Sequence, residues 1–332
     1  MAPAPGRRHA YAQGEMKSAA VLAALIVVTA AVSRGAAATP QPVRPLPGTV
    51  ATLHPADALG AVSGGGGDAW VDDRWDERLL RIDHRTGTVV ARLPVQGRLA
   101  LAQGAGSVWA LESGGGYGRG LRGPLLRIDP RSDRVTARIP IPALGFGVVV
   151  ADDGIWVWGP DRLMRVAEGR LATRIPVADE EVGETTGFAR RGVEAVITTL
   201  DGHLLRYDAG TGRLLDSVRL PFTEPALQLA DRDRLIVAAD GEVAAVDPDT
   251  STVQWRTQLG YRVGSVVEAG GALWAYGANV RDAGDRVWKL DPASGAVLGR
   301  VLLPAFGTMG MAVIGDTIWV TTASGRVLAL RR

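Results

Sequence analysis

The chain has 332 residues, of which 46% are hydrophobic and 22% are charged, an ordinary balance for a folded globular protein of one or two domains. It has no cysteine, which excludes disulfides, thiolate metal sites and a cysteine nucleophile. Four of its 37 basic residues but only one of its 35 acidic residues lie within residues 1–38. The remaining 33 basic and 34 acidic residues give no concentrated basic charge, and we expect no nucleic-acid binding.

The N-terminal segment has the pattern of an export signal. Lys17 precedes a 14-residue apolar run (residues 19–32), which ends before three small residues, Ala36, Ala37 and Ala38. This pattern predicts a signal peptide over residues 1–38, with translation starting at Met1 or Met16 and cleavage after Ala38. The alternative is an uncleaved membrane anchor, although the run is short for a membrane span. Residues 39–47 include four prolines and read as an extended linker.

A repeat runs from residue 57 to the end of the chain. Each copy has an apolar strand, a strand that often holds tryptophan, a strand ending in aspartate, and an outer strand after a Thr-Gly-type turn. The second strand recurs at positions 70, 109, 156, 196, 236, 274 and 319, at the spacing of propeller blades. The sequence therefore predicts an all-β fold, a seven-bladed β-propeller of four-stranded antiparallel blades over residues 48–332.

The last copy of the repeat lacks its outer strand. Residues 48–53 (GTVATL) have the character of the outer strand of the first copy, residues 87–93 (GTVVARL). We therefore predict that this N-terminal strand completes the last blade and closes the ring, because closure removes an exposed sheet edge.

The turn motifs resemble those of known propeller families. Residues 245–255 (AVDPDTSTVQW) resemble the tryptophan-docking motif of quinoprotein-type (PQQ-like) repeats, with Ser251 where that motif has glycine. Residues 106–110 (GSVWA) and 127–130 (RIDP) are similar to elements of YVTN-type and streptogramin-lyase-type seven-bladed propellers. The likeness covers nearly all of residues 48–332. It implies the fold more than an activity, because the Asp and Thr side chains of such turns bond nearby backbone amides.

Residues with catalytic potential are few. Beyond the signal segment there are three histidines, His54, His84 and His203, and no pattern brings them together. The resemblance to streptogramin-lyase-type enzymes implies histidines at the channel mouth, and the resemblance to quinone dehydrogenases implies calcium and cofactor ligands. Neither set can be placed here. We predict no catalytic residues, no metal ligands and no cofactor, and the sequence favours a non-enzyme.

The links between strands differ in length on the two faces of the predicted ring. Links from the second to the third strand, and from the fourth strand to the next blade, share one face and include the long ones. Function in repeat rings usually belongs to the face that receives insertions. The candidate binding residues on these links are Trp75, Glu112, Tyr117, Arg119, Arg122, Glu180, Glu184, Arg281 and Asp285.

Aromatic residues add a second pattern. Phe146, Phe188, Phe222, Phe306 and Tyr261 are each predicted to lie just before an innermost strand, near one rim of the channel. Two interpretations remain open, a collar that grips a ligand and packing between adjacent blades, of which packing is favoured. The second-strand tryptophans are predicted to be core between blades. They are Trp70, Trp109, Trp156, Trp274 and Trp319.

These observations predict a secreted or cell-envelope binding module. It would bind a protein or a small-molecule ligand on the loop-rich face, contact the membrane only through an uncleaved signal segment, and be a monomer. The alternative is an extracytoplasmic enzyme, lyase-like or quinone-linked, with its site at the channel mouth. The identity of the ligand or partner is open.

Overall fold

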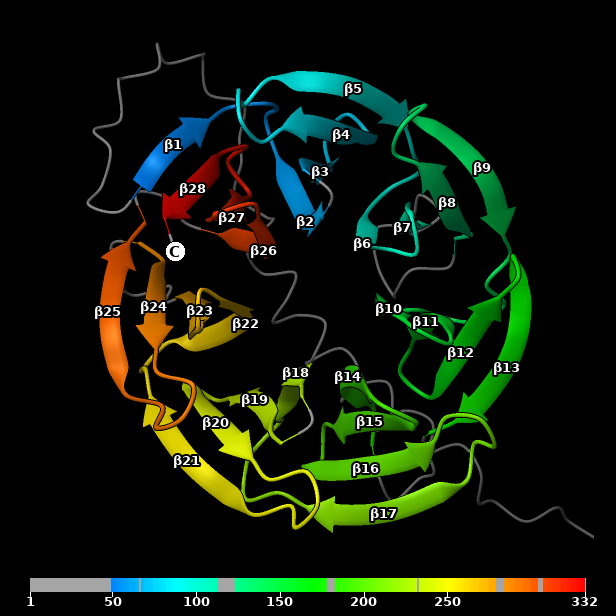
Figure 1. Cartoon of the computed structure of the whole chain (residues 1–332), viewed down its shortest axis with the longest axis vertical. Helices are drawn as coiled ribbons and strands as arrows, with labels where there is room; N and C mark the ends of the chain where they lie inside the picture. Colours follow the sequence, from blue (N-terminus) through cyan, green and yellow to red (C-terminus); the bar gives the residue numbers. More distant parts are fainter. Residues whose placement is uncertain are drawn as a thin grey trace, which may run out of the picture. The chain divides into compact units, whose positions relative to one another are not determined.

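A computed structural model describes residues 49–65, 67–112, 123–177, 183–231, 233–278, 284–303 and 307–331. The described residues form 28 strands in seven four-stranded sheets, which are arranged as a ring (Figure 1). Neighbouring strands within each sheet pair antiparallel, so each sheet is one blade. Within these ranges, no helix has the length and apolarity needed to cross a membrane. The prediction of a seven-bladed all-β propeller is confirmed.

Blades 1 to 3 follow one another along the chain. Blade 1 contains β2 (Leu59–Gly65), β3 (Asp68–Asp73), β4 (Arg78–Asp83) and β5 (Val89–Pro94). Blade 2 contains β6 (Leu99–Gly104), β7 (Ser107–Glu112), β8 (Leu125–Asp129) and β9 (Arg134–Ile139). Blade 3 contains β10 (Gly147–Ala151), β11 (Gly154–Trp158), β12 (Arg162–Ala167) and β13 (Arg170–Pro176).

Blades 4 to 6 have the same order. Blade 4 contains β14 (Thr185–Arg191), β15 (Glu194–Thr199), β16 (His203–Asp208) and β17 (Leu214–Arg219). Blade 5 contains β18 (Ala226–Ala230), β19 (Leu235–Ala239), β20 (Glu242–Val246) and β21 (Val253–Gln258). Blade 6 contains β22 (Arg262–Ala269), β23 (Ala272–Ala278), β24 (Arg286–Leu290) and β25 (Val297–Leu302).

Blade 7 combines both ends of the described chain. It contains β26 (Thr308–Ile314), β27 (Thr317–Thr322), β28 (Val327–Arg331) and, as its outer strand, β1 (Thr49–Leu53). β1 pairs antiparallel with β28, with Leu53 opposite Val327 and Thr49 opposite Leu330. Figure 1 shows this blue strand beside the red strand. The predicted closure by the N-terminal strand is therefore confirmed.

The core lies between blades. Trp70 of blade 1 belongs to the same buried cluster as Leu99 and Val108 of blade 2, and Trp319 of blade 7 clusters with Leu59 of blade 1. All five second-strand tryptophans are at most 5% exposed, which confirms them as core. Burial of such large apolar side chains is the main stabilising term in a fold of this kind.

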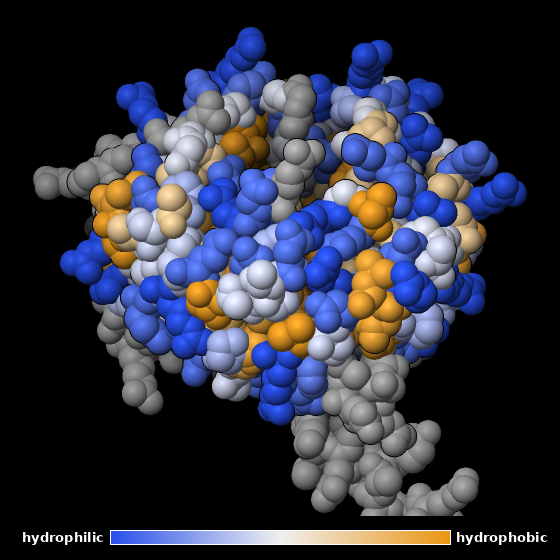
Figure 2. All heavy atoms as spheres, turned by 60° about the horizontal axis from the view of Figure 1, so that its bottom comes forward, coloured by the Kyte–Doolittle hydropathy of each residue, from blue (hydrophilic) through white to orange (hydrophobic). Residues whose placement is uncertain are grey.

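The outer strands alternate in exposure, as expected for a sheet with one solvated face. β9 and β13 alternate exposed residues with partly buried ones along most of their length. In the view of Figure 2, small groups of hydrophobic residues accordingly lie among hydrophilic ones on the surface.

The turn between the third and fourth strand repeats from blade to blade. In blade 1, Oδ1 of Asp83 accepts the backbone N–H groups of Arg85 and Thr86, and the N–H of Gly87 donates to the carbonyl of Asp83 at 2.8 Å. These backbone N–H groups also hold the pKa of Asp83 below its usual range. Gly87 has φ of 72°, which is in the left-handed region that favours glycine. Asp83 is therefore a structural residue.

The tryptophan-docking motif joins blade 5 to blade 6. Trp255 of β21 donates from Nε1 to the carbonyl of Pro292 at 3.2 Å, in the β24–β25 turn. A Cβ atom on Gly295 of that turn would lie only 2.4 Å from the Trp255 ring. The absence of a side chain at Gly295 is therefore what allows the indole to pack on the next blade.

Candidate functional site

The strands alternate in direction, so the links fall on two faces. The loop-rich face carries the links from second to third strand and from fourth strand to the next blade. The turn face carries the β2–β3, β6–β7, β10–β11, β14–β15, β18–β19, β22–β23 and β26–β27 turns and the third-to-fourth-strand turns. These two names are kept below.

Trp75 is the most exposed aromatic side chain in the described part of the loop-rich face. It lies between β3 and β4, and 59% of it is exposed to solvent. Oδ1 of Asp73 accepts the backbone N–H groups of Trp75 and Asp76, both at 3.3 Å. A short turn closed by an aspartate holds this indole outward with little backbone freedom to lose.

Two candidate acids of this face are buried instead of exposed. Glu112 is 0% exposed; its carboxylate accepts the N–H of Gln96 at 2.9 Å and a hydrogen bond from Arg138 at 3.2 Å. Asp285 is 1% exposed, and its Oδ2 accepts the N–H and the hydroxyl of Thr308 at 2.6 and 2.7 Å. Both carboxylates bond to the links and strands around them, so they anchor the loop-rich face from below.

Asp72 has the same role and was not among the predicted site residues. Its Oδ2 accepts the N–H of Leu99, the first residue of the next inner strand, at 3.3 Å, and its buried Oδ1 has no hydrogen-bond donor among the described residues. Burial raises the pKa of Asp72 to about 7. The signal in the sequence was its place next to the last residue of a second strand, near the end at which Glu112 lies in β7.

The predicted aromatic residues pack within and between blades. Phe146 stacks edge-on against Trp158 with ring centroids 5.6 Å apart, and Tyr261 stacks similarly on Trp288 at 5.2 Å. Phe222 is 9% exposed under the guanidinium of Arg256. These contacts support the packing interpretation, and a ligand-binding role for the rings stays a prediction.

Phe188 corrects one positional expectation. It was predicted to precede an inner strand, but β14 begins at Thr185, so Phe188 lies inside the strand. Its ring is 5% exposed and packs on Trp156 of blade 3 with centroids 5.8 Å apart. The strand starts early because Thr185 pairs with Thr199 and a bulge follows.

Of the remaining candidates, one is partly exposed and the others lie outside the described residues. Glu184 is partly exposed just before β14, and its carbonyl accepts the N–H of Leu200 at 2.7 Å. The set outside the described residues consists of Tyr117, Arg119, Arg122, Glu180, Arg281 and Phe306. The predicted signal peptide and linker also lie outside them.

One group of side chains in the described ranges has the spacing of metal ligands. Asp68, Asp83 and His84 each offer an atom within 4.8 Å of the others, on the turn face of blade 1. Asp68 already pairs with Arg81 at 2.7 Å, and Asp83 is engaged by its own turn. A cation here would compete with a bound guanidinium, so the group is a poor candidate for a metal centre.

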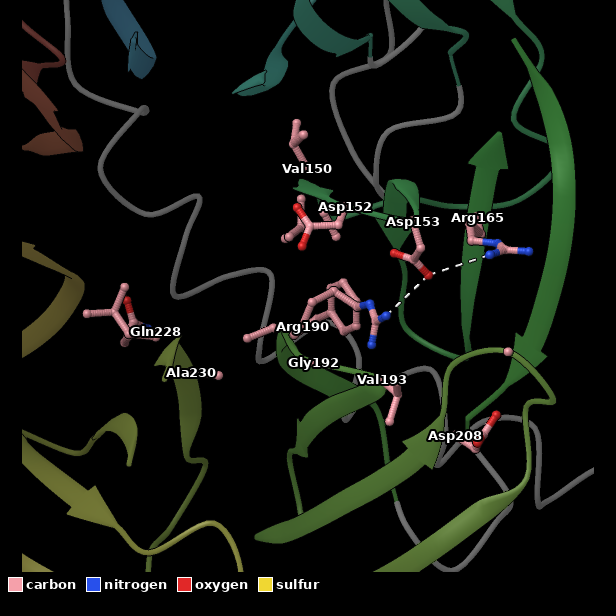
Figure 3. A pocket seen from close by; sticks show the side chains of 16 residues that line it. Val150, Asp152, Asp153, Arg165, Arg190, Gly192, Val193, Asp208, Gln228 and Ala230 are labelled. Carbon is pink, nitrogen blue, oxygen red and sulfur yellow. Dashed lines mark ion pairs between the residues drawn. The ribbon is translucent and has the colours of Figure 1, made fainter. Parts of the chain in front are cut away.

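The turn face contains a pocket of about 700 Å³ between blades 3, 4 and 5 (Figure 3). Its charged lining includes Asp153, which forms ion pairs with Arg165 of its own blade 3 and with Arg190 of blade 4. Burial alone would raise the pKa of Asp153, but a hydrogen bond from Trp156 and the charge of Arg190 hold it below its usual range. The sequence reasoning, which favoured the other face, missed this pocket.

The fold and the turn motifs define a β-propeller of PQQ-like repeats. The family model described as "Outer membrane protein assembly factor BamB" matches residues 76–332, and the chain belongs to this family. No curated protein matches the chain.

Solved structures match the fold at low identity. The β-propeller domain of Cps50 (Swd1) from Myceliophteria thermophila has a TM-score of 0.70 and 13% identity, covering 86% of this chain and 99% of that one. A chain of the Mitotic Checkpoint Complex has a TM-score of 0.68 and 12% identity, covering 92% and 99%. The computationally designed Ika8 protein has a TM-score of 0.60 and 13% identity, covering 86% and 98%. These likenesses show the fold alone.

Proposed function

We propose that this protein is an extracytoplasmic binding module that holds a protein partner on its loop-rich face. Two observations support a place outside the cytoplasm. The first 38 residues have the pattern of a signal peptide, and the family is described as an outer membrane protein assembly factor. A ring of packed blades with the longer links on one face is an arrangement suited to holding a partner.

Trp75 is the observation that carries the proposal. An exposed tryptophan on a fixed turn offers a large apolar contact and loses little conformational entropy when a partner covers it. Such residues are enriched among those that dominate binding energy at protein interfaces. The buried carboxylates Asp72, Glu112 and Asp285 bond to the backbone of Leu99, Gln96 and Thr308, so the described part of this face is preorganised.

Site-specific photocrosslinking in the producing cell tests this function. A photoreactive phenylalanine analogue placed at position 75 should give a discrete protein adduct, identified by mass spectrometry. The matched control is position 297 on the outer strand β25, where Val297 is 49% exposed. The proposal would be wrong if adducts formed at position 297 but not at position 75, or if no adduct formed at either position.

A substitution then measures the contribution of Trp75 to partner binding. With the crosslinked partner in hand, Trp75→Ala should weaken its binding by about 2 kcal/mol or more, as expected for an aromatic hot spot. Val297→Ala should change the affinity by less than about 0.5 kcal/mol. Equal effects of the two substitutions would contradict a loop-rich interface.

A further inference from the structure

The pocket on the turn face has apolar walls and a charged floor. Its apolar lining includes Val150 of β10, Phe188 of β14 and Leu229 of β18, and Val193 at its edge is 75% exposed. The volume of about 700 Å³ is in the range of small-molecule sites. Figure 3 shows inner strands of three blades contributing to it.

The floor of this pocket holds two guanidinium groups on one carboxylate. Oδ2 of Asp153 lies 3.1 Å from Arg190 and 3.5 Å from Arg165, as the dashed lines in Figure 3 mark, and Oδ1 accepts Nε1–H of Trp156 at 3.0 Å. The three charged groups sum to one positive charge. Such a charge in a partly desolvated place is costly unless an anion joins it.

Both guanidinium groups have further partners: Arg190 donates to the carbonyl of Glu194, and Arg165 donates to the hydroxyl of Thr173 at 3.4 Å. The Nε atoms of Arg165 and Arg190 are buried, and neither donates a hydrogen bond within the described residues. The Arg190 side chain is only 9% exposed and lies over the Trp156 ring, 5.2 Å from its centroid. Packing therefore fixes its orientation, and a fixed guanidinium is suited to recognising a carboxylate.

The rim of the pocket carries the opposite charge. Asp152, next to Asp153 in the β10–β11 turn, is exposed, and no ion pair with it occurs among the described residues. Asp208 lines the other side but is engaged by Thr211 in its own turn. The pocket therefore has a positive floor, apolar walls and a negative rim.

We propose that this pocket binds a small zwitterion with an apolar side chain, an amino acid or short peptide with free termini. Its carboxylate pairs with Arg165 and Arg190, its ammonium group faces Asp152, and its side chain packs among Val150, Phe188 and Leu229. A multiply charged anion would be repelled by Asp152 and Asp208. A purely cationic ligand would leave the positive floor uncompensated, so the zwitterion is the best electrostatic complement.

Titration calorimetry on the mature protein tests the recognition of both charges. The probe is the dipeptide leucyl-leucine, compared with its N-acetylated form and its C-terminal amide. The intact dipeptide should bind at one site, and each blocked form should bind at least roughly tenfold more weakly. Equal binding of the three compounds, or no binding at millimolar concentration, overturns the proposal.

Substitutions locate the site. Arg165→Met and Asp152→Asn should each weaken dipeptide binding by roughly tenfold or more. The matched control is Arg81→Met, because Arg81 holds the same place in β4 of blade 1 as Arg165 in β12 of blade 3 and is similarly exposed, at 22% against 25%. If Arg165→Met fails to fold, the dipeptide affinity of Asp152→Asn, a substitution at an exposed position, tests the site by itself. The proposed site would be wrong if Asp152→Asn bound the dipeptide with wild-type affinity. It would also be wrong if Arg81→Met weakened dipeptide binding as much as Arg165→Met.

The test is independent of the protein-binding function. Trp75→Ala should leave dipeptide affinity unchanged, because Trp75 lies on the loop-rich face and does not line this pocket. A protein partner that recognised the pocket through its own C-terminus would supply only the carboxylate. In that case the N-acetylated dipeptide would bind as well as the free one, and the zwitterion proposal would be wrong.

Discussion

At the scale of single residues, one position in the turn between the third and fourth strands has a left-handed backbone, and its residue type differs between blades. Gly87, Gly212 and Gly295 hold that position in blades 1, 4 and 6 with φ between 71° and 74°. Blade 5 has Ser251 there, with φ of 56°. A side chain in this region costs about 1–2 kcal/mol. The Ser251 hydroxyl is also buried without a hydrogen-bond partner within the described residues.

Replacing Ser251 with glycine should therefore stabilise the protein. We expect Ser251→Gly to raise the free energy of unfolding by about 1 kcal/mol, because relief of backbone strain and of an unpaired hydroxyl exceeds the added chain entropy. Urea denaturation measures this change. The reverse control, Gly212→Ser, should lower stability, since its Cβ would lie 3.3 Å from Ile175 at φ of 74°. A destabilised Ser251→Gly variant would refute the strain argument.

Asp72 is a second residue whose chemistry has a measurable consequence. Its pKa is about 7 in the folded protein and close to 3.8 when unfolded, so the folded state holds a proton that the unfolded chain releases. Its contribution to stability is full below about pH 4 and is lost as the pH rises through about 7. Arg74 and Arg98 oppose this shift, Asp73 adds to it, and burial is the largest cause.

Asp72→Asn removes this titration and keeps an oxygen for the Leu99 N–H. We expect the stability of the variant relative to wild type to increase by about 2 kcal/mol between about pH 5 and pH 8. Chemical denaturation of both proteins at several pH values gives this difference directly. Asp83→Asn, in an exposed turn, is the control and should not show an increase in that direction. Parallel curves for Asp72→Asn and wild type would mean that Asp72 is charged throughout.

At the scale of elements, β1 is the strand on which the ring depends. It covers the edge of β28, and Leu53 packs against the turn of blade 1, where a Cβ on Gly87 would lie 2.5 Å from it. One short strand thus joins blade 7 to blade 1. Without it, β28 would present a row of unpaired N–H and C=O groups to solvent.

Deleting residues 48–53 from the mature chain should therefore open the ring. We expect the free energy of unfolding to fall by about 3 kcal/mol or more, and we expect self-association through the uncovered β28 edge. Thermal denaturation and size-exclusion chromatography measure the two effects. Deleting residues 39–44, an equal length ahead of the strand, should change neither. An unaltered melting transition in the first variant would show that closure contributes little.

At the scale of the whole molecule, the two faces offer separate surfaces. The loop-rich face presents Trp75 over buried carboxylates, whereas the turn face contains the pocket between blades 3, 4 and 5. Because the strands run from one face to the other, a substitution on one face need not disturb the other. The partner-binding and dipeptide-binding experiments can thus succeed or fail independently, and Trp75→Ala and Asp152→Asn separate them.

Much of the fold could be predicted because the repeat is local and periodic. Trp70, Trp109 and Trp319 mark second strands at blade spacing, and the GTVATL segment matches the strand missing from blade 7. The candidate site was less predictable. Glu112 and Asp285 occur in or beside long links, which predicts exposure, yet both side chains are buried. Burial of a polar residue at the end of a strand depends on the neighbouring blade, which a local pattern does not contain.

The sequence by itself determined the number of blades, the strand order and the closure of the ring, because each follows from hydrophobic periodicity and turn chemistry within a few residues. Only the tertiary structure decided which charges meet. Asp153 and Arg165 meet within blade 3, as Asp68 and Arg81 do within blade 1, whereas Arg190 reaches Asp153 from the neighbouring blade 4. Side-chain convergence across blades is a property of the ring geometry, and no spacing along the chain encodes it.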